Sequence, residues 1–111
     1  MDKFLNIIGA LNDESRVLIL AFLTKNGELC VCDLQSSLNM IQSRLSRHLK
    51  ILKDSGFLEV RRKGAWAYYR IKEDLSLFHL QCLEAIKELN LSLPPLVKSR
   101  ANWRENVRSS R

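Results

Sequence analysis

The fold is decided by residues 32–54, which read CDLQSSLNMIQSRLSRHLKILKD. Apolar side chains recur at helical spacing on both sides of Asn39, so the stretch predicts a short helix at about 32–38 and a second at about 41–54. Gly56 follows the second helix and is typical of a helix end. Two helices joined by so short a turn predict a helix-turn-helix, whose second helix enters the major groove of DNA.

The flanking sequence predicts two helices before this stretch and a β-hairpin and a helix after it. The expected elements are helices at about 4–12, 13–26 and 74–91 and strands at 57–62 and 65–71. Asp13 is a good N-cap for the second helix, and Lys63-Gly64 is the expected hairpin turn. The predicted fold class is mainly α with a small β-hairpin, a winged helix-turn-helix.

Length and composition favour one domain with its own core, since 46% of the 111 residues are hydrophobic. We expect this domain to span residues 1–91, followed by a basic, mobile C-terminal tail at 92–111 that Trp103 could anchor in part. No apolar run reaches the length of a membrane span, and no signal peptide is present, so a cytoplasmic protein without a membrane partner is expected. In that reducing compartment, three cysteines favour metal binding or redox sensing over disulfides.

The net charge of +6 suits a polyanionic partner such as double-stranded DNA. Residues 96–111 carry a net +4, so the body carries only +2. Its basic groups concentrate between Arg44 and Arg70, which makes their distribution more informative than their sum.

The predicted second helix of the helix-turn-helix has one polar face and one apolar face. Its polar face consists of Gln42, Ser43, Ser46, Arg47 and Lys50, and its apolar face of Ile41, Leu45, His48, Leu49 and Leu52. We predict that Gln42, Ser43 and Arg47 read bases, because Gln and Arg make bidentate contacts to adenine and guanine. Ser46 and Lys50 are predicted to contact phosphate.

The hairpin carries Arg61, Arg62 and Lys63 next to its turn, and we predict that this basic wing contacts phosphate or the minor groove. A polar helix face or a basic turn alone is usually ordinary solvated surface. The two features together, in this order, favour DNA binding.

Cys30 and Cys32 stand where the first helix of the helix-turn-helix begins. A helix start is expected to lower the pKa of a thiol, which favours a thiolate that binds soft ions. Side chains two apart in a helix point about 200° apart, so an ion held by both sulfurs is predicted to unwind or tilt this helix. Zinc usually takes four ligands, and no further cysteine or histidine is nearby in sequence, so a three-coordinate soft ion fits better. The alternative is a pair of buried structural cysteines.

Four motifs resemble the ArsR/SmtB family of metalloregulatory winged-helix repressors. They are Asn-Asp-Glu-Ser-Arg at 12–16, Glu-Leu-Cys-Val-Cys-Asp-Leu at 28–34, Gln-Ser-Arg-Leu-Ser-Arg-His-Leu at 42–49 and Tyr-Tyr-Arg-Ile at 68–71. The resemblance covers about residues 4–91 and implies a homodimer that represses an operon and releases operator DNA on binding a toxic ion. The cysteine motif is similar to that of the arsenic-responsive branch, which implies As(III) or Sb(III) as the inducer at Cys30 and Cys32.

The same resemblance implies that the first and last helices build the dimer interface. The expected contacts there are Phe4, Ile7, Ile8, Leu75, Phe78, Cys82, Ile86 and Leu89. Gln35 stands where arsenic-sensing relatives often have a third cysteine, so water, a small thiol or Cys82 would complete the coordination. We expect Cys82 to pack as a small apolar side chain instead. The family's zinc site on the last helix looks absent, because Asp74 lacks a histidine two residues on.

Two other functions fit the residues less well. Cys30 and Cys32 could sense another thiophilic metal, or oxidants or persulfide, because low-pKa thiols are also oxidisable. The winged helix could instead dock on a protein, with its basic face incidental. An enzyme is not expected, because the sequence shows no nucleophile with a paired base, no catalytic carboxylate pair and no phosphate-binding glycine loop.

Overall fold

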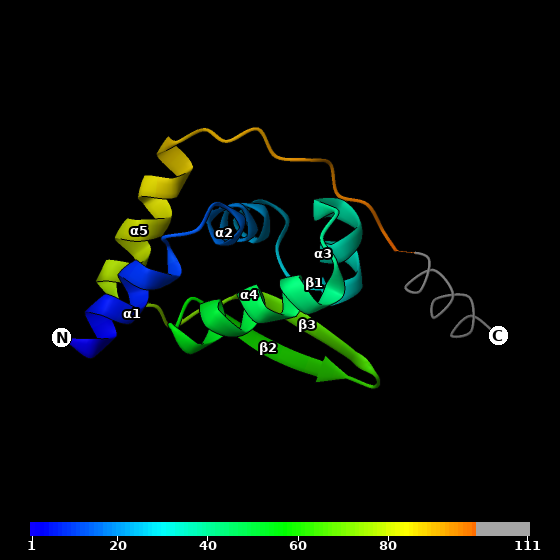
Figure 1. The fold of residues 1–111 in the computed structure, drawn as a ribbon, viewed down its shortest axis with the longest axis horizontal. Helices are drawn as coiled ribbons and strands as arrows, with labels where there is room; N and C mark the ends of the chain where they lie inside the picture. Colours follow the sequence, from blue (N-terminus) through cyan, green and yellow to red (C-terminus); the bar gives the residue numbers. More distant parts are fainter. Residues whose placement is uncertain (100–111) are drawn as a thin grey trace.

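The computed structural model describes residues 1–99, which form five helices and a small sheet (Figure 1). Their bounds are α1 (Asp2–Ala10), α2 (Glu14–Asn26), β1 (Leu29–Cys30), α3 (Val31–Leu38), α4 (Gln42–Asp54), β2 (Leu58–Lys63), β3 (Trp66–Ile71) and α5 (Leu77–Glu88). The predicted winged helix-turn-helix is therefore confirmed. The expectation of a tail anchored by Trp103 lies outside the described residues.

The sheet contains a strand that the sequence analysis did not predict. Its order is β1-β3-β2 and all pairings are antiparallel, with Cys30 opposite Tyr68 and Leu29 opposite Tyr69. Lys63 pairs with Trp66, so the turn of the wing is Gly64-Ala65 rather than Lys63-Gly64. Because β1 pairs with β3, the cysteine motif is joined to the wing through backbone hydrogen bonds.

The core lies between α2, α4 and the inner face of the sheet. It contains Leu45, Leu49 and Leu52 of α4, which are fully buried as predicted. Ile41 is wrong as a core prediction: it precedes the first turn of α4 as its N-cap residue and is 69% exposed. The packing against α2 and β2 orients the polar face of α4 outward.

Arg16, the last residue of the Asn-Asp-Glu-Ser-Arg motif, joins three helices. The backbone N–H of Arg16 donates to the Asp13 side chain at 3.2 Å, which caps α2. Its guanidinium donates to the Ala10 carbonyl at the end of α1 (2.8 Å) and to Nδ1 of buried His48 on α4 (3.2 Å). Burial lowers the pKa of His48. The motif therefore fixes α4 against the N-terminal helices, and His48 belongs to the core as predicted.

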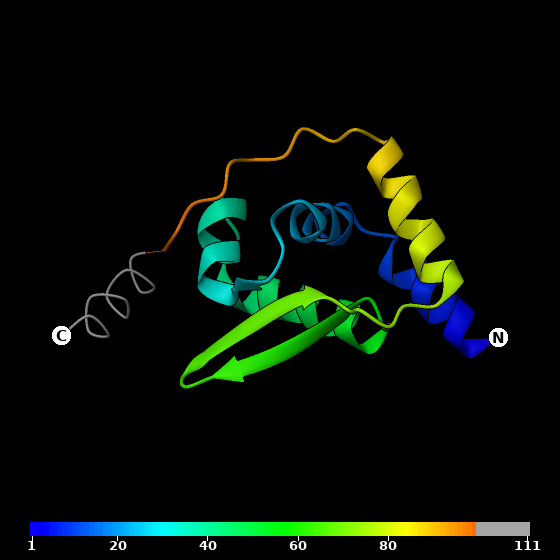
Figure 2. The same cartoon turned by 180° about the vertical axis from the view of Figure 1, so that it is seen from behind.

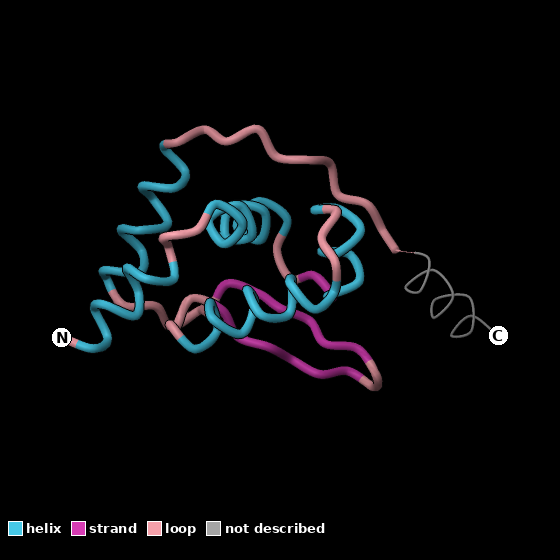
Figure 3. The backbone as a smooth tube through the Cα atoms, viewed as in Figure 1, coloured by secondary structure: helices cyan, strands magenta, loops and turns pink. Residues whose placement is uncertain are grey.

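The segment after α5 runs extended past α2 to α3, on the side of the molecule away from the wing (Figures 2 and 3). The Val97 N–H donates to Ser37 Oγ at 2.8 Å, and the Ser99 N–H donates to Asp33 Oδ1 at 3.0 Å. Lys98 places its ammonium 3.5 Å from the same buried carboxylate. The described part of the predicted mobile tail, 92–99, thus contacts the cysteine-bearing helix.

Helices α1 and α5 lie side by side (Figures 1 and 2), and the Phe4 and Phe78 rings stack at 5.1 Å. Two predicted interface residues are corrected here, because Ile7 and Ile86 are buried in the core of the protomer itself. Exposed apolar side chains remain on the outer surface of the pair: Phe4, Leu5, Ile8, Leu77, Leu80 and Leu89. Across the described residues, every helix is too short or too polar to traverse a lipid bilayer.

Candidate metalloid and DNA-binding site

The sulfur atoms of Cys30 and Cys32 lie 3.1 Å apart. Cys30 is the last residue of β1 and has an extended backbone (φ −73°, ψ 159°), whereas Cys32 lies in the first turn of α3. The predicted separation of about 200° is wrong, because only one of the two residues is helical. The pair can meet one guest atom without unwinding the helix.

Burial changes the expected chemistry of Cys30. Its side chain is 1% exposed, and burial, followed by the hydrogen bond with Cys32, raises the pKa of the Cys30 thiol to about 12. The predicted lowering by the helix start is therefore wrong for Cys30: the Asp33 N–H does favour the thiolate, but loss of water outweighs it. Cys30 is a buried, protonated thiol at neutral pH.

The Cys30 sulfur also caps α3. It accepts a hydrogen bond from the backbone N–H of Asp33 at 3.3 Å, as a serine or aspartate oxygen would at an N-cap. One atom thus serves as helix cap and as candidate ligand.

The described residues supply no third protein ligand beside the two sulfurs, since no group of three or more His, Cys, Asp or Glu is placed to hold a metal ion. Cys82 lies on α5, half-buried against the core, which agrees with the packing role expected for it. His79 is also engaged elsewhere, with Nε2 2.8 Å from the Ser55 carbonyl.

The predicted DNA-reading residues of α4 are all exposed on one face, namely Gln42, Ser43, Ser46, Arg47 and Lys50. The Lys50 ammonium lies 3.0 Å from the Asp54 carboxylate, but both side chains are more than half exposed, so this pair is weak and leaves Lys50 open to phosphate. The geometry is compatible with the predicted roles.

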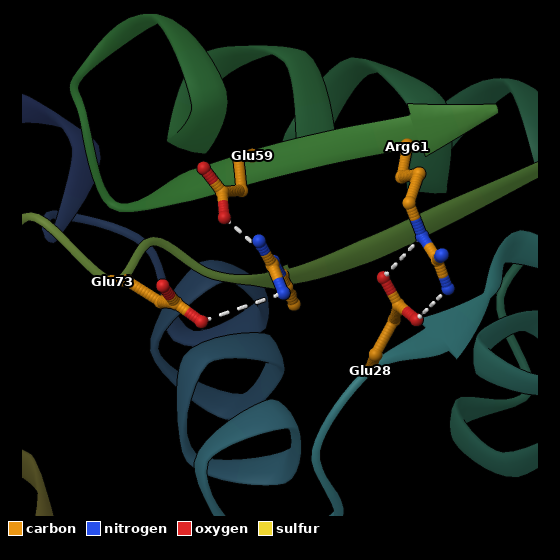
Figure 4. A network of polar contacts seen from close by, with 5 residues as sticks. Glu28, Glu59, Arg61 and Glu73 are labelled. Atoms are coloured by element: carbon orange, nitrogen blue, oxygen red, sulfur yellow. Dashed lines mark hydrogen bonds and ion pairs between the residues drawn. The ribbon is translucent and has the colours of Figure 1, made fainter.

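Successive side chains of a strand point to opposite faces of the sheet, so the neighbouring cations of the wing have different surroundings. Figure 4 shows Arg61 on β2 reaching Glu28, just before β1, through contacts of 3.2 and 2.6 Å. Arg61 is therefore engaged within the protein, whereas Arg62 lines a cleft facing α4 and Lys63 is exposed beside the turn. The Arg70 guanidinium bridges Glu59 (2.6 Å) and Glu73 (3.6 Å).

The cleft between α3, α4 and the wing brings the two candidate sites together. Cys32 lines it together with predicted DNA contacts: Gln42, Ser46, Lys50 and Arg62. The proximity of the two candidate sites is not visible in the sequence, because it depends on the pairing of β1 with β3, which places the wing beside α3.

Residues 13–60 match the family described as bacterial regulatory protein, arsR family. The chain is 36% identical over 85 residues to the arsenic resistance transcriptional regulator ArsR2 of Pseudomonas putida, covering 77% of this chain and 74% of that one. It is 48% identical over 61 residues to the arsenical resistance operon repressor of Escherichia coli, covering 55% and 52%.

Solved structures give the same assignment. HlyU from Vibrio cholerae matches with a TM-score of 0.68 and 31% identity over 79% of this chain and 91% of that one. The AntR antimony-specific transcriptional repressor matches with a TM-score of 0.66 and 28% identity over 80% and 78%. The chain therefore belongs to the ArsR family of bacterial regulatory proteins, and it is a winged helix-turn-helix transcriptional regulator rather than an enzyme.

Proposed function

We propose that this protein is a homodimeric repressor that leaves its operator when As(III) or Sb(III) binds Cys30 and Cys32. The observation that carries the proposal is the 3.1 Å separation of the two sulfurs at the junction of β1 and α3. Relatives named for arsenic resistance and an antimony-specific structural neighbour support the choice of ion.

The sulfur separation favours a pyramidal ion over a tetrahedral one. With bonds of about 2.3 Å, the length of a zinc–thiolate bond, sulfurs 3.1 Å apart subtend about 85° at the guest atom. A tetrahedral zinc ion needs sulfurs roughly 3.8 Å apart and two further ligands. Trivalent arsenic and antimony carry a lone pair that holds their bonds near right angles, so they fit Cys30 and Cys32 as they stand.

Binding reaches the DNA-reading elements by two routes. Bonding to the guest occupies the Cys30 sulfur and weakens its acceptance of the Asp33 N–H, and a lost N-cap costs about 0.5–2 kcal/mol. Helix α3 packs directly on α4, which carries the reading face. The backbone of Cys30 also pairs with Tyr68 on β3, so a shift of the cysteine moves the wing.

On DNA, we assign base reading to Gln42, Ser43 and Arg47, whose exposed side chains lie toward the start of α4. The phosphate contacts are assigned to Ser46, Lys50, Arg62 and Lys63. Arg61 takes another role in this assignment, because its bidentate pair with Glu28 holds β1 against the wing.

The dimer is assigned to the outer surface of α1 and α5. This surface exposes several large apolar side chains, and an apolar surface of this kind is unfavourable in water. The side chains are Phe4, Ile8, Leu77, Leu80 and Leu89. A related winged helix-turn-helix domain from Mycobacterium bovis is described as homodimeric and matches with a TM-score of 0.64 and 26% identity over 80% of this chain. The two recognition helices of the dimer, related by its two-fold axis, would then read a palindromic operator.

The test uses the full-length protein and an operator selected from random DNA. Fluorescence anisotropy would measure the Kd of the operator complex with and without sodium arsenite, antimony tartrate, zinc and cadmium. We expect arsenite and antimony to weaken DNA binding by about 5- to 150-fold, the usual range of allosteric coupling. Saturating operator must then weaken arsenite binding by the same factor, and equal arsenite affinity with and without operator would exclude the proposal.

The same sulfur separation favours a second candidate, an oxidant sensor. Sulfurs 3.1 Å apart need to approach by about 1 Å to form a disulfide of about 2.05 Å. The raised pKa of the buried Cys30 thiol opposes oxidation and ion binding alike, because the thiolate is both the reactive form and the ligand, so it does not choose between the two candidates. Comparing DNA release by arsenite with release by peroxide or polysulfide separates the two candidates.

A further inference from the structure

An open cleft of about 650 Å³ lies between α3, α4 and the wing. Cys32 and Gln35 line it from α3, and three cations line it from the other two elements: Lys50, Lys53 and Arg62. No Asp or Glu is among its lining residues in the described part of the chain. The cleft therefore places a thiol beside concentrated positive charge.

The coordination chemistry of the proposed inducer leaves one position to fill. Arsenous acid, As(OH)₃, exchanges each As–O bond for an As–S bond, and the departing hydroxyl leaves as water with the proton of the incoming thiol. The arsenic stays trivalent throughout. Cys30 and Cys32 account for two of the three exchanges, and the described residues hold no third ligand beside them.

We propose that the third bond is made by a small anionic thiol from solution, which occupies this cleft with its negative group against Lys50, Lys53 and Arg62. This inference rests on the proposed function. Cys32 lines the cleft, whereas Cys30 is buried, so the cleft is the open side from which a third ligand can reach the guest. Trp66 adds an apolar wall for the carbon chain of the thiol.

Occupancy of the cleft would also bear on DNA release. Lys50 and Arg62 are phosphate contacts in our assignment, and an anion held beside them competes for the same charges. The incoming thiol thereby adds electrostatic competition to the change in α3.

The experiment compares thiols of similar size and different charge. Arsenite is titrated into the full-length protein with 2-mercaptoethanesulfonate, 2-mercaptoethanol or cysteamine, and with a thiol-free phosphine reductant. The apparent arsenite Kd and the arsenic X-ray absorption spectrum, which counts sulfur neighbours, are measured for each. Protein-free titrations correct for the affinity of each thiol for arsenite, and ethanesulfonate controls for ionic strength.

Each of the three exposed cations is expected to contribute as a typical surface ion pair. Together they should make the apparent arsenite Kd about tenfold lower with the anionic thiol than with the neutral thiol. The cationic thiol should bind weakest. The spectrum should show three sulfurs with the sulfonate thiol and two sulfurs with one oxygen in the phosphine alone. Lys53→Gln should reduce the preference for the anion severalfold, whereas Lys25→Gln, on a lysine that does not line the cleft, should leave it unchanged.

Equal arsenite affinity with all three thiols would overturn the inference and leave the two-cysteine site standing. Three sulfurs in the phosphine alone would overturn it as well, because a protein cysteine would then supply the third bond. Failure to bind arsenite under every condition would instead refute the proposed function itself.

Discussion

The substitution Cys30→Ser separates the two roles of the Cys30 sulfur. Serine is among the best N-cap residues, so its hydroxyl oxygen can accept the Asp33 N–H that the sulfur now accepts at 3.3 Å. The hydroxyl can also donate to the Cys32 sulfur, which keeps the buried group satisfied. We expect the free energy of unfolding to change by less than about 1 kcal/mol, since the cap is retained.

The arsenite response is a different quantity and should disappear. Oxygen is a poor ligand for a soft ion, so the coupling of about 5- to 150-fold falls to within about twofold of none. The operator Kd without arsenite stays within about twofold of the wild type. Cys30→Ala removes cap and ligand together, so it should lose about 1–3 kcal/mol of stability in addition to the response.

Urea unfolding gives the stability of each variant, and anisotropy gives its operator Kd with and without arsenite. Cys82→Ser is the matched control, because it changes a half-buried cysteine outside the proposed site. If Cys30→Ser loses DNA binding in the absence of arsenite, the cysteine is structural and the reasoning fails. Full retention of the arsenite response would refute it equally.

Further predictions concern the other elements. Arg47→Ala should relax sequence preference, whereas Lys63→Ala should weaken all DNA alike and flatten the salt dependence; binding-selection profiles and salt titrations would show the reverse if our division is wrong. Asp33→Asn should cost about 1–3 kcal/mol in urea unfolding, because its buried carboxylate accepts from the C-terminal segment. Leu80→Glu should convert the proposed dimer to monomer in analytical ultracentrifugation, with the fold kept in circular dichroism. The raised pKa of Cys30 gives stability that is fully present below pH 9 and is lost toward pH 12, so the wild type should lose about 1 kcal/mol per pH unit above 9 relative to Cys30→Ser.

Helices α1, α3 and α4 were predictable because their apolar side chains recur at helical spacing, whereas α2 lacks such a period and was indicated by its N-cap, Asp13. Leu45, Leu49 and Leu52 recur on one face of α4, and that face is the buried one. The interface residues expected on α5 are apolar, but their sequence does not show what covers each of them. Ile86 is covered by the core of its own chain, while Leu80, which was not among the expected interface residues, is exposed. Periodicity identifies an apolar face, and only packing identifies the partner.

The cysteine site was predictable in composition but not in geometry. Strand β1 has two residues, too few for alternation to appear, yet it gives Cys30 an extended backbone and brings its sulfur to Cys32. The hydrogen bond at the start of α3 lowers the pKa of Cys30, but burial, which a sequence pattern does not reveal, dominates it. Both errors arise from long-range contacts, since β1 exists only by pairing with Tyr68 and Tyr69 on β3.

The corrected geometry changes how the switch has to work. If the sulfurs stood on opposite sides of a helix, part of the binding energy of the ion would be lost in unwinding it, and affinity would be sacrificed for coupling. Because they already stand 3.1 Å apart, the proposed ion would bind a preformed pair, and strain would not be the main source of coupling. In the proposed function, the differential free energy would come from two losses: the structural contacts of Cys30, namely the cap on α3, worth about 0.5–2 kcal/mol, and its pairing with the wing, and the access of phosphate to the cations that line the cleft with Cys32. The first loss is independent of salt and the second is screened by it, so the salt dependence of arsenite-driven release measures the share of each.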